Sequence, residues 1–170
     1  GNVLKLNGRP VKFRGVNRHE TEPENGRSVS RETMLRDVLL MRAHNIDTVR
    51  TSHYPDDPHW YDLCDRYGIM VVAEANVEAH GVGYGPDGNH SEELFLKNRL
   101  GQKPSWRKAM VERNVNQVLN YRNHPCVVMW SLGNETSEGT NFVAAAEAVH
   151  AADPQRRPVQ YQGMNAAADV

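Results

Sequence analysis

The sequence has few cysteines, no charge excess of either sign and no long apolar run, and each absence excludes a class of protein. Its 170 residues include 20 basic and 21 acidic side chains, for a net charge of −1. That balance gives no electrostatic surface for nucleic acid or an anionic membrane. No apolar run approaches the roughly 18 residues that a membrane-spanning helix needs. We therefore expect neither a nucleic-acid partner nor a membrane partner.

The two cysteines, Cys64 and Cys126, both lie within periodic apolar segments. Cysteines in such positions are typical of small buried hydrophobic residues rather than of a disulfide or a zinc site. No charged, apolar and small-residue signal peptide begins the chain. The opening at Gly1 instead predicts a cut inside a longer protein.

Segments typical of strands and helices alternate along the chain. Apolar runs predict strands at residues 12–17, 46–51, 69–73, 126–132 and 158–161. Helices are predicted between them, with starts at Ser30, Asp57 and Ser105 and a further helix around residues 142–153. Asp57 followed by Pro58 is a strong start, because Asp accepts from free backbone N–H groups and Pro fits the first turn. A polar, glycine-rich loop is expected at residues 81–104.

Continuous apolar strands with helices between them indicate an α/β protein whose parallel sheet is covered by helices. The right-handed crossover rule leaves a doubly wound sheet or a (β/α)₈ barrel. A complete barrel needs roughly 250 residues, so the chain is either a small open α/β domain or the first part of a barrel. No Gly-x-Gly-x-x-Gly follows a strand, which leaves a nucleotide site without support.

Polar side chains gather where the predicted strands end, at residues 17–20, 50–55, 74–80 and 133–135. In a barrel all of these ends open on the active-site face. One such group alone is as well explained by a capped turn with local ion pairs. Four groups at matching ends predict a pocket.

The last of these groups ends a hidden strand in Asn134 and Glu135. A carboxyl group in apolar surroundings keeps its proton and can act as a general acid. The neighbouring amide both donates and accepts hydrogen bonds, which suits a hydroxyl-rich ligand. A rival interpretation puts Glu135 in the first turn of the next helix, near its positive end. The two interpretations are compatible.

Glu78 and His80 are alternate residues of an extended segment, so their side chains point to the same side. With Glu135 as a third ligand, this oxygen-rich set favours Mg²⁺ or Mn²⁺ over zinc. By spacing alone, a Glu-x-His pair is more often a solvated or hydrogen-bonded loop than a metal site. His124 is expected to order the loop before its strand rather than to touch a ligand.

Six stretches of the chain resemble the catalytic barrel of family 2 glycoside hydrolases, and in particular the bacterial β-galactosidases. They are GVNRHE at residues 15–20, VRTSHYP at 49–55, CDRYG at 64–68, EANVEAHG at 74–81, RNHP at 122–125 and WSLGNE at 130–135. They follow the family's order over nearly the whole chain, which makes the resemblance specific. It implies that residues 1–170 are the N-terminal portion of a catalytic TIM barrel, about strands 1–5 with their helices, in a longer multidomain enzyme.

The resemblance also implies site roles. Glu135 is similar to the family's general acid/base, and Asn134 to the residue that holds the sugar's 2-hydroxyl. His19, His53 and His80 match residues of the galactose pocket. The magnesium site of the β-galactosidases matches Glu78, His80 and Glu135, with Mn²⁺ as the alternative ion. The implied substrate is a β-galactoside, because β-glucuronidases tend to differ in the EANVEAHG and WSLGNE stretches.

Retaining glycosidases need two carboxylates about 5–5.5 Å apart. The family's nucleophile is a Glu on a later strand than this chain reaches, so the chain alone is expected to be inactive. The alternative is a half-barrel that binds sugar or metal without turnover. Unpaired sheet edges predict a homo-oligomer. The residues do not fix the compartment, although the cytoplasm is favoured over secretion for the parent enzyme.

Overall fold

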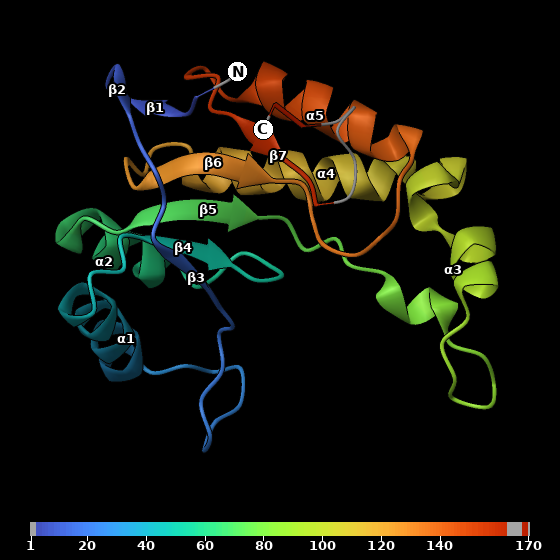
Figure 1. Cartoon of the computed structure of the whole chain (residues 1–170), viewed down its shortest axis with the longest axis horizontal. Coiled ribbons are helices and arrows are strands. Elements are labelled where there is room, and N and C mark those ends of the chain that lie inside the picture. The colour runs from blue at the N-terminus through green and yellow to red at the C-terminus, as the bar shows by residue number, and fades with distance from the viewer. Residues whose placement is uncertain (1–2, 163–167, 170) are drawn as a thin grey trace.

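One parallel sheet forms the centre of the structure (Figure 1). The computed structural model describes residues 3–162 and 168–169. The strands of this sheet lie side by side in chain order: β3 (Gly15–Arg18), β4 (Thr48–Thr51), β5 (Met70–Glu74), β6 (Val127–Ser131) and β7 (Val159–Gln160). Each neighbouring pair is parallel. A doubly wound sheet reverses its strand order part-way across, so this uninterrupted order is that of part of a (β/α)₈ barrel.

The longer helices between these strands in the described part of the chain are α1 (Arg31–Ala43), α2 (Pro58–Tyr67), α4 (Pro104–Tyr121) and α5 (Thr140–Ala152). α1 packs against α2, and α4 packs against α5. Figure 1 shows the first pair near β4 and β5 and the second pair near β6 and β7. Apolar side chains of helices and strands meet in one buried core, whose largest fully buried members include Trp60, Trp130, Tyr61 and Phe142. No helix in the described part of the chain combines the length and apolarity that a membrane crossing needs.

A short antiparallel hairpin precedes the sheet. It consists of β1 (Lys5–Leu6) and β2 (Arg9–Pro10). In Figure 1 it lies near the amino ends of the strands, on the side away from their polar carboxyl ends.

Most helix ends follow the predicted local chemistry. Ser30 accepts a hydrogen bond from Thr33 N–H at the start of α1. Asp57 does the same for His59 N–H at the start of α2, which ends at Gly68 in the left-handed conformation. The predicted cap at Ser105 is wrong, since α4 begins at Pro104 and has no side-chain cap. Proline at the first helical position lacks the N–H group that a cap would satisfy, so the helix begins there.

The predicted loop at residues 81–104 is partly helical. It contains the 3₁₀ turns η1 (His80–Gly83) and η2 (Leu100–Gln102) and the short helix α3 (Glu92–Asn98). Ser91 caps α3, but no residue of α3 is buried. A helix without a buried face has no apolar periodicity to reveal it. This excursion extends beyond the carboxyl ends of the strands in Figure 1.

Candidate active site

Glu74, the last residue of β5, connects the ends of three strands. Its side chain is fully buried and accepts hydrogen bonds from three neighbours. Arg50 Nε and Ser131 Oγ each lie 2.5 Å from Oε2, and His53 Nδ1 lies 2.6 Å from Oε1. A buried carboxylate needs such donors in place of water. No site role was predicted for Glu74. The position of this acid directly after an apolar strand could have indicated that it lies beside the pocket.

Asn134 is held by hydrogen bonds at both ends of its amide. Arg50 Nη2 donates to Asn134 Oδ1 over 3.0 Å, and Asn134 Nδ2 donates to Glu78 Oε1 over 2.9 Å. Its backbone N–H also donates to Val77 O over 2.8 Å. An amide has two donors and two acceptor lone pairs, so one of each remains for a ligand. The orientation of that free donor and acceptor is set by Arg50 and Glu78.

Glu135 projects from a turn rather than from a helix. Its φ is 31°, and Gly133 before it has φ 145°. A Cβ on Gly133 would lie 2.4 Å from Val77 O, so only glycine allows this close approach. Helix α5 begins at Thr140, so the rival interpretation of Glu135 as a first-turn residue is wrong.

His80 lies beside Glu135, with Nδ1 3.6 Å from Oε2. Their side chains are 43% and 52% exposed. The described residues therefore do not supply the apolar enclosure expected around Glu135. A polar, half-open position still allows an acid to meet a ligand from solvent.

The predicted metal ligands Glu78, His80 and Glu135 occupy one region without forming a compact triad. Glu78 contacts Asn134, and His80 contacts Glu135. All three side chains are at least partly exposed, so they can rotate. Two carboxylates and an imidazole match the donor set of a hard divalent cation that keeps several waters. The residues thus fit Mg²⁺ or Mn²⁺ in chemistry, and convergence on an ion would need side-chain movement.

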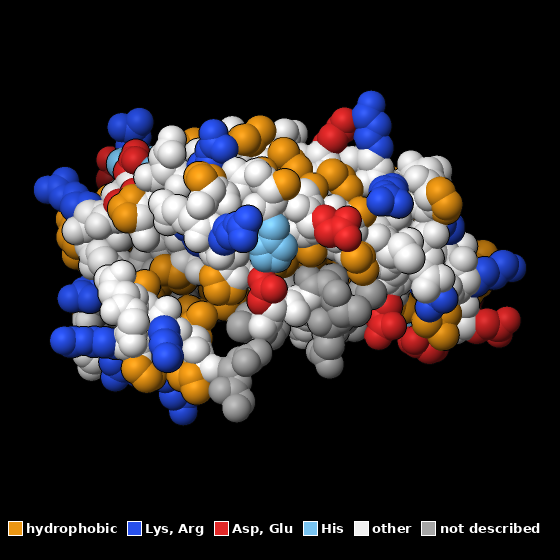
Figure 2. Space-filling view, turned by 90° about the horizontal axis from the view of Figure 1, so that it is seen from above, with side chains coloured by type: hydrophobic (Ala, Val, Ile, Leu, Met, Phe, Trp, Pro, Cys, Tyr) orange, Lys and Arg blue, Asp and Glu red, His pale blue; other side chains and the backbone are white. Residues whose placement is uncertain are grey.

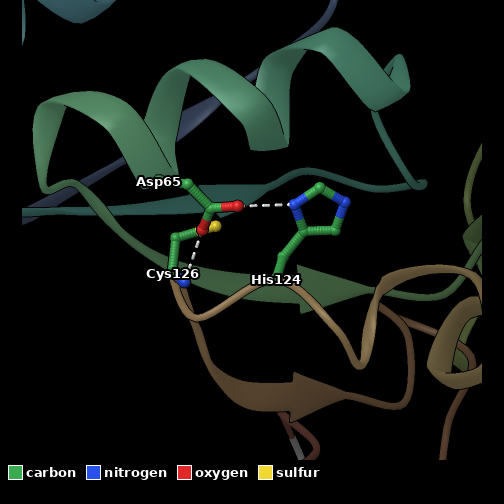
Figure 3. A group of neighbouring side chains, drawn as sticks. All are labelled: Asp65, His124 and Cys126. Carbon is green, nitrogen blue, oxygen red and sulfur yellow. Dashed lines mark hydrogen bonds and ion pairs between the residues drawn. The ribbon is translucent and has the colours of Figure 1, made fainter.

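A compact group of three metal-binding side chains does occur among the described residues, but at the amino end of β6 (Figure 3). Asp65 Oδ2 lies 2.6 Å from His124 Nδ1, and Asp65 Oδ1 accepts from Cys126 N–H over 2.7 Å. Two ligands of a tetrahedral zinc with bonds of roughly 2.0–2.3 Å are farther apart than that. Burial raises the pKa of the Cys126 thiol, and Asp65 beside it raises it further. The group therefore joins α2 to β6, and His124 orders its loop as predicted.

An open pocket lies at the carboxyl ends of β3, β4 and β5. Its volume is about 730 Å³. The predicted sugar-binding residues His19, His53 and His80 all line it, together with Glu78. The rings of His19 and His53 meet edge to face with centroids 5.3 Å apart. The structure thus brings the predicted histidines to one pocket, and Asn134 and Glu135 adjoin it through Glu78 and His80.

A larger hollow of about 830 Å³ lies elsewhere, between the N-terminal segment and α5. It is lined by Val3, His150 and Asp169 among others and includes none of the predicted site residues. Figure 2 looks onto the α5 side of the molecule and shows charges of both signs scattered among apolar side chains. Among the described residues the hollow holds one imidazole–carboxylate pair, with His150 Nε2 3.3 Å from Asp169 Oδ2.

Comparison with known proteins gives one consistent family. Residues 1–170 match the family described as "Glycosyl hydrolases family 2, TIM barrel domain". A β-galactosidase of Pectobacterium atrosepticum is 48% identical over 161 residues, which are 95% of this chain and 14% of that protein. A β-galactosidase of Vibrio cholerae is 47% identical with the same coverage. The chain thus spans only 14% of the length of these curated relatives.

Solved structures with the same architecture include two β-glucuronidases. The enzyme of Bifidobacterium dentium, complexed with coumarin-3-O-glucuronide, has a TM-score of 0.72 at 32% identity over 91% of this chain and 24% of that one. The enzyme of Faecalibacterium prausnitzii has a TM-score of 0.72 at 34% identity over 94% and 26%. Both the family match and these structures confirm the predicted partial barrel.

Proposed function

Because the chain belongs to family 2 of the glycosyl hydrolases, as part of their TIM barrel domain, we propose that it provides the acid/base side of the active site of a retaining β-galactosidase. The substrate would be a terminal β-D-galactosyl residue of a β-galactoside. The main support is the Arg50–Asn134–Glu78 hydrogen-bond chain, which fixes the amide directly before Glu135 at a pocket lined by histidines. The relatives named β-galactosidases are 47–48% identical, against 32–34% for the β-glucuronidases above.

The proposed reaction uses Glu135 twice. Glu135 first protonates the glycosidic oxygen as the bond to the leaving group breaks. After the leaving group departs, the same carboxylate takes a proton from the water that attacks the glycosyl-enzyme. Asn134 holds the sugar's 2-hydroxyl with its free donor and acceptor, and His19 and His53 bind the ring's other hydroxyl groups.

Glu78, His80 and Glu135 would hold Mg²⁺, with Mn²⁺ as the alternative. A bound divalent cation there supplies positive charge beside the acid/base and orients its ligands. The contribution of this chain is to bring two carboxylates and one imidazole to the edge of the sugar pocket. The hydrogen bond from Asn134 Nδ2 to Glu78 Oε1 connects this ligand to the residue directly before Glu135.

The nucleophile is proposed to lie outside this chain, because the other acids near the pocket have structural partners. Glu74 is buried under three hydrogen bonds. Glu20 accepts from Asp57 N–H at the start of α2. Glu78 holds Asn134. The isolated chain should therefore bind a galactoside without cleaving it, which is also the behaviour of the alternative, a half-barrel that binds sugar or metal without turnover.

The first test is Glu135→Gln in the complete enzyme that contains this chain. We expect hydrolysis of an alkyl β-galactoside to fall by about 10²- to 10⁴-fold, the usual contribution of a general acid. For a dinitrophenyl β-galactoside, the rate of the glycosylation step should fall much less, because its leaving group needs no proton. The exposed Glu138 offers a matched control, since Glu138→Gln removes a nearby charge without touching the pocket residues.

Three outcomes would contradict the proposal. Equal losses for both substrates would mean that Glu135 does not donate the proton. If the unaltered enzyme cleaved the corresponding β-glucuronide faster than the β-galactoside, the substrate would be a β-glucuronide instead. Turnover by the isolated chain that Glu135→Gln abolishes would place a nucleophile within residues 1–170.

A further inference from the structure

A buried ionic cluster includes residues close in sequence to the two pocket histidines, and the proposed reaction does not use it. Arg18 is the last residue of β3, immediately before His19, and is only 6% exposed. Arg18 Nη1 lies 2.7 Å from Asp56 Oδ2, and Arg18 Nε lies 3.0 Å from Asp37 Oδ2. The guanidinium also stacks over Trp60, with 4.0 Å between its central carbon and the ring centroid. One cation therefore connects β3 to α1, to α2 and to the loop after β4.

Backbone hydrogen bonds also join the end of β3 to the loop after β4, which carries His53. The carbonyl oxygen of Arg18 accepts from both the N–H and the hydroxyl of Ser52, each at 3.0 Å. On the far side of His19, Glu20 N–H donates to Tyr54 Oη over 3.1 Å. These bonds attach the residue before and the residue after His19 to the residues that flank His53. The hydrogen bonds of Arg18 and Glu20 thus determine how the His19 and His53 rings meet.

The composition of the cluster is unusual for a purely structural one. Asp56 is only 2% exposed. Arg18 Nη2 and Asp56 Oδ1 have no hydrogen-bond partner among the described residues. Apolar side chains of similar volume often stabilise a fold as well as a buried ion pair does. A directional hydrogen bond of 2.7 Å between two buried side chains is better suited to fixing the relative position of β3 and the loop after β4 than to adding stability.

We propose that Arg18 and Asp56 are positioning residues that set the distance and tilt between His19 and His53 in the sugar pocket. Arg18 determines where β3 ends and His19 begins. Asp56 holds the loop that carries His53 against Arg18. The inference rests on the proposed function only for the identity of the ligand, because the geometry of the two rings can be measured without a sugar.

The experiment is NMR of the imidazole signals of His19 and His53 in the unaltered chain and in Arg18→Met and Asp56→Asn. The chain offers a matched control in Arg157, which is 7% exposed, pairs with Asp153 at 3.5 Å and lies 5.4 Å from the Trp130 ring centroid. Arg157→Met therefore removes a comparable buried Arg–Asp–Trp cluster before β7. We expect Arg18→Met to shift both histidine signals and Arg157→Met to leave them in place, although both variants lower Tm.

Titration with galactose adds a binding readout. Arg18→Met should weaken binding about tenfold, the effect of losing one well-placed hydrogen bond, and Arg157→Met should not. If Arg18→Met does not fold, Asp56→Asn decides, because it keeps the size of the side chain and still should move the His53 signal. Unmoved signals of both histidines in the folded variants would overturn the inference. Moved signals without galactose binding by the unaltered chain would support it and count against the proposed function alone.

Discussion

At the scale of single residues, Asp56 shows how burial and charge compete at one carboxyl group. Burial raises its pKa to about 7, although Arg18 at 2.7 Å favours the charged form. The nearby acids Glu20 and Asp37 raise it further. One guanidinium thus serves three carboxyl groups, so the cluster has more negative than positive charge when all of them ionise. The titratable and charged groups that face Asp56 are Arg18, Glu20, Asp37, Tyr61, Cys64 and Tyr121.

This pKa makes stability depend on pH with a definite sign. In the unfolded chain Asp56 loses its proton near its ordinary value of 3.8, whereas the folded chain keeps it until about pH 7. The stabilising effect of the bound proton is therefore complete below about pH 4 and is lost as pH rises towards 7. Asp56→Asn should remove this pH dependence of the free energy of unfolding. Between pH 5 and pH 8 the unaltered chain should therefore lose on the order of 2 kcal/mol of that free energy relative to the variant.

Urea unfolding at pH 5 and pH 8 measures that difference. Asp47→Asn is a suitable control, since the hydrogen bonds of Asp47 with Arg14 and Thr48 hold its pKa below the ordinary value despite the effect of burial. Equal pH slopes for Asp56→Asn and the unaltered chain would show that Asp56 ionises normally in the folded state.

At the scale of elements, the turn after β6 determines where the acid and amide stand. Gly133→Ala should cost at least about 2 kcal/mol more in the free energy of unfolding than Gly68→Ala. Both glycines have positive φ, but a Cβ on Gly68 meets nothing within 4 Å, whereas on Gly133 it meets a backbone oxygen at 2.4 Å. The first substitution therefore costs only the left-handed penalty of roughly 1–2 kcal/mol, and the second also displaces Val77 or the turn.

Chemical unfolding of the two variants, with Mg²⁺ titration of each, checks this expectation. Similar unfolding free energies would mean that the turn adapts to a side chain without cost. Loss of ion binding in Gly133→Ala alone would add that the turn positions Glu135.

The elements were predictable where each has its own local signal. The caps at Ser30 and Asp57 and the apolar strands gave the succession of strands and helices along the chain, and the strand ends gave the groups that line the pocket. The pattern left two strand orders open, a doubly wound sheet and a barrel, and the structure has that of the barrel. The exposed helix α3 lacks such a signal. The partners of Glu74 and the bend at Glu135 depend on loop geometry, which no periodic pattern in the sequence encodes.

At the scale of the whole molecule, the sheet has one open edge, at β3, which pairs only with β4 among the described residues. The outer edge of β7 is covered at Val159, whose backbone N–H and carbonyl both bond to Asp169 over 2.8 Å. Val16 and Leu40, which are 37% and 59% exposed, line a hollow of about 410 Å³ along β3. Exposed apolar side chains beside an unpaired strand favour association with another sheet or helix.

We therefore expect the isolated chain to self-associate, and Leu40→Lys to shift it towards the monomer. Light scattering over a concentration series measures the mass. Leu119→Lys is the matched control, because Leu119 is 48% exposed on α4 and lies outside the hollow. A monodisperse monomer for the unaltered chain, or equal effects of the two substitutions, would contradict association through the β3 edge.

The chain order of the sheet also has a consequence for synthesis on the ribosome. Each strand pairs with the one made just before it, so every new strand emerges beside an edge that already exists. The side-chain partners of Asn134 and Glu135 are Arg50, Glu78 and His80, all of which are translated earlier. The turn that carries Asn134 and Glu135 can therefore meet these partners during translation once it leaves the exit tunnel, before α5 has emerged behind it.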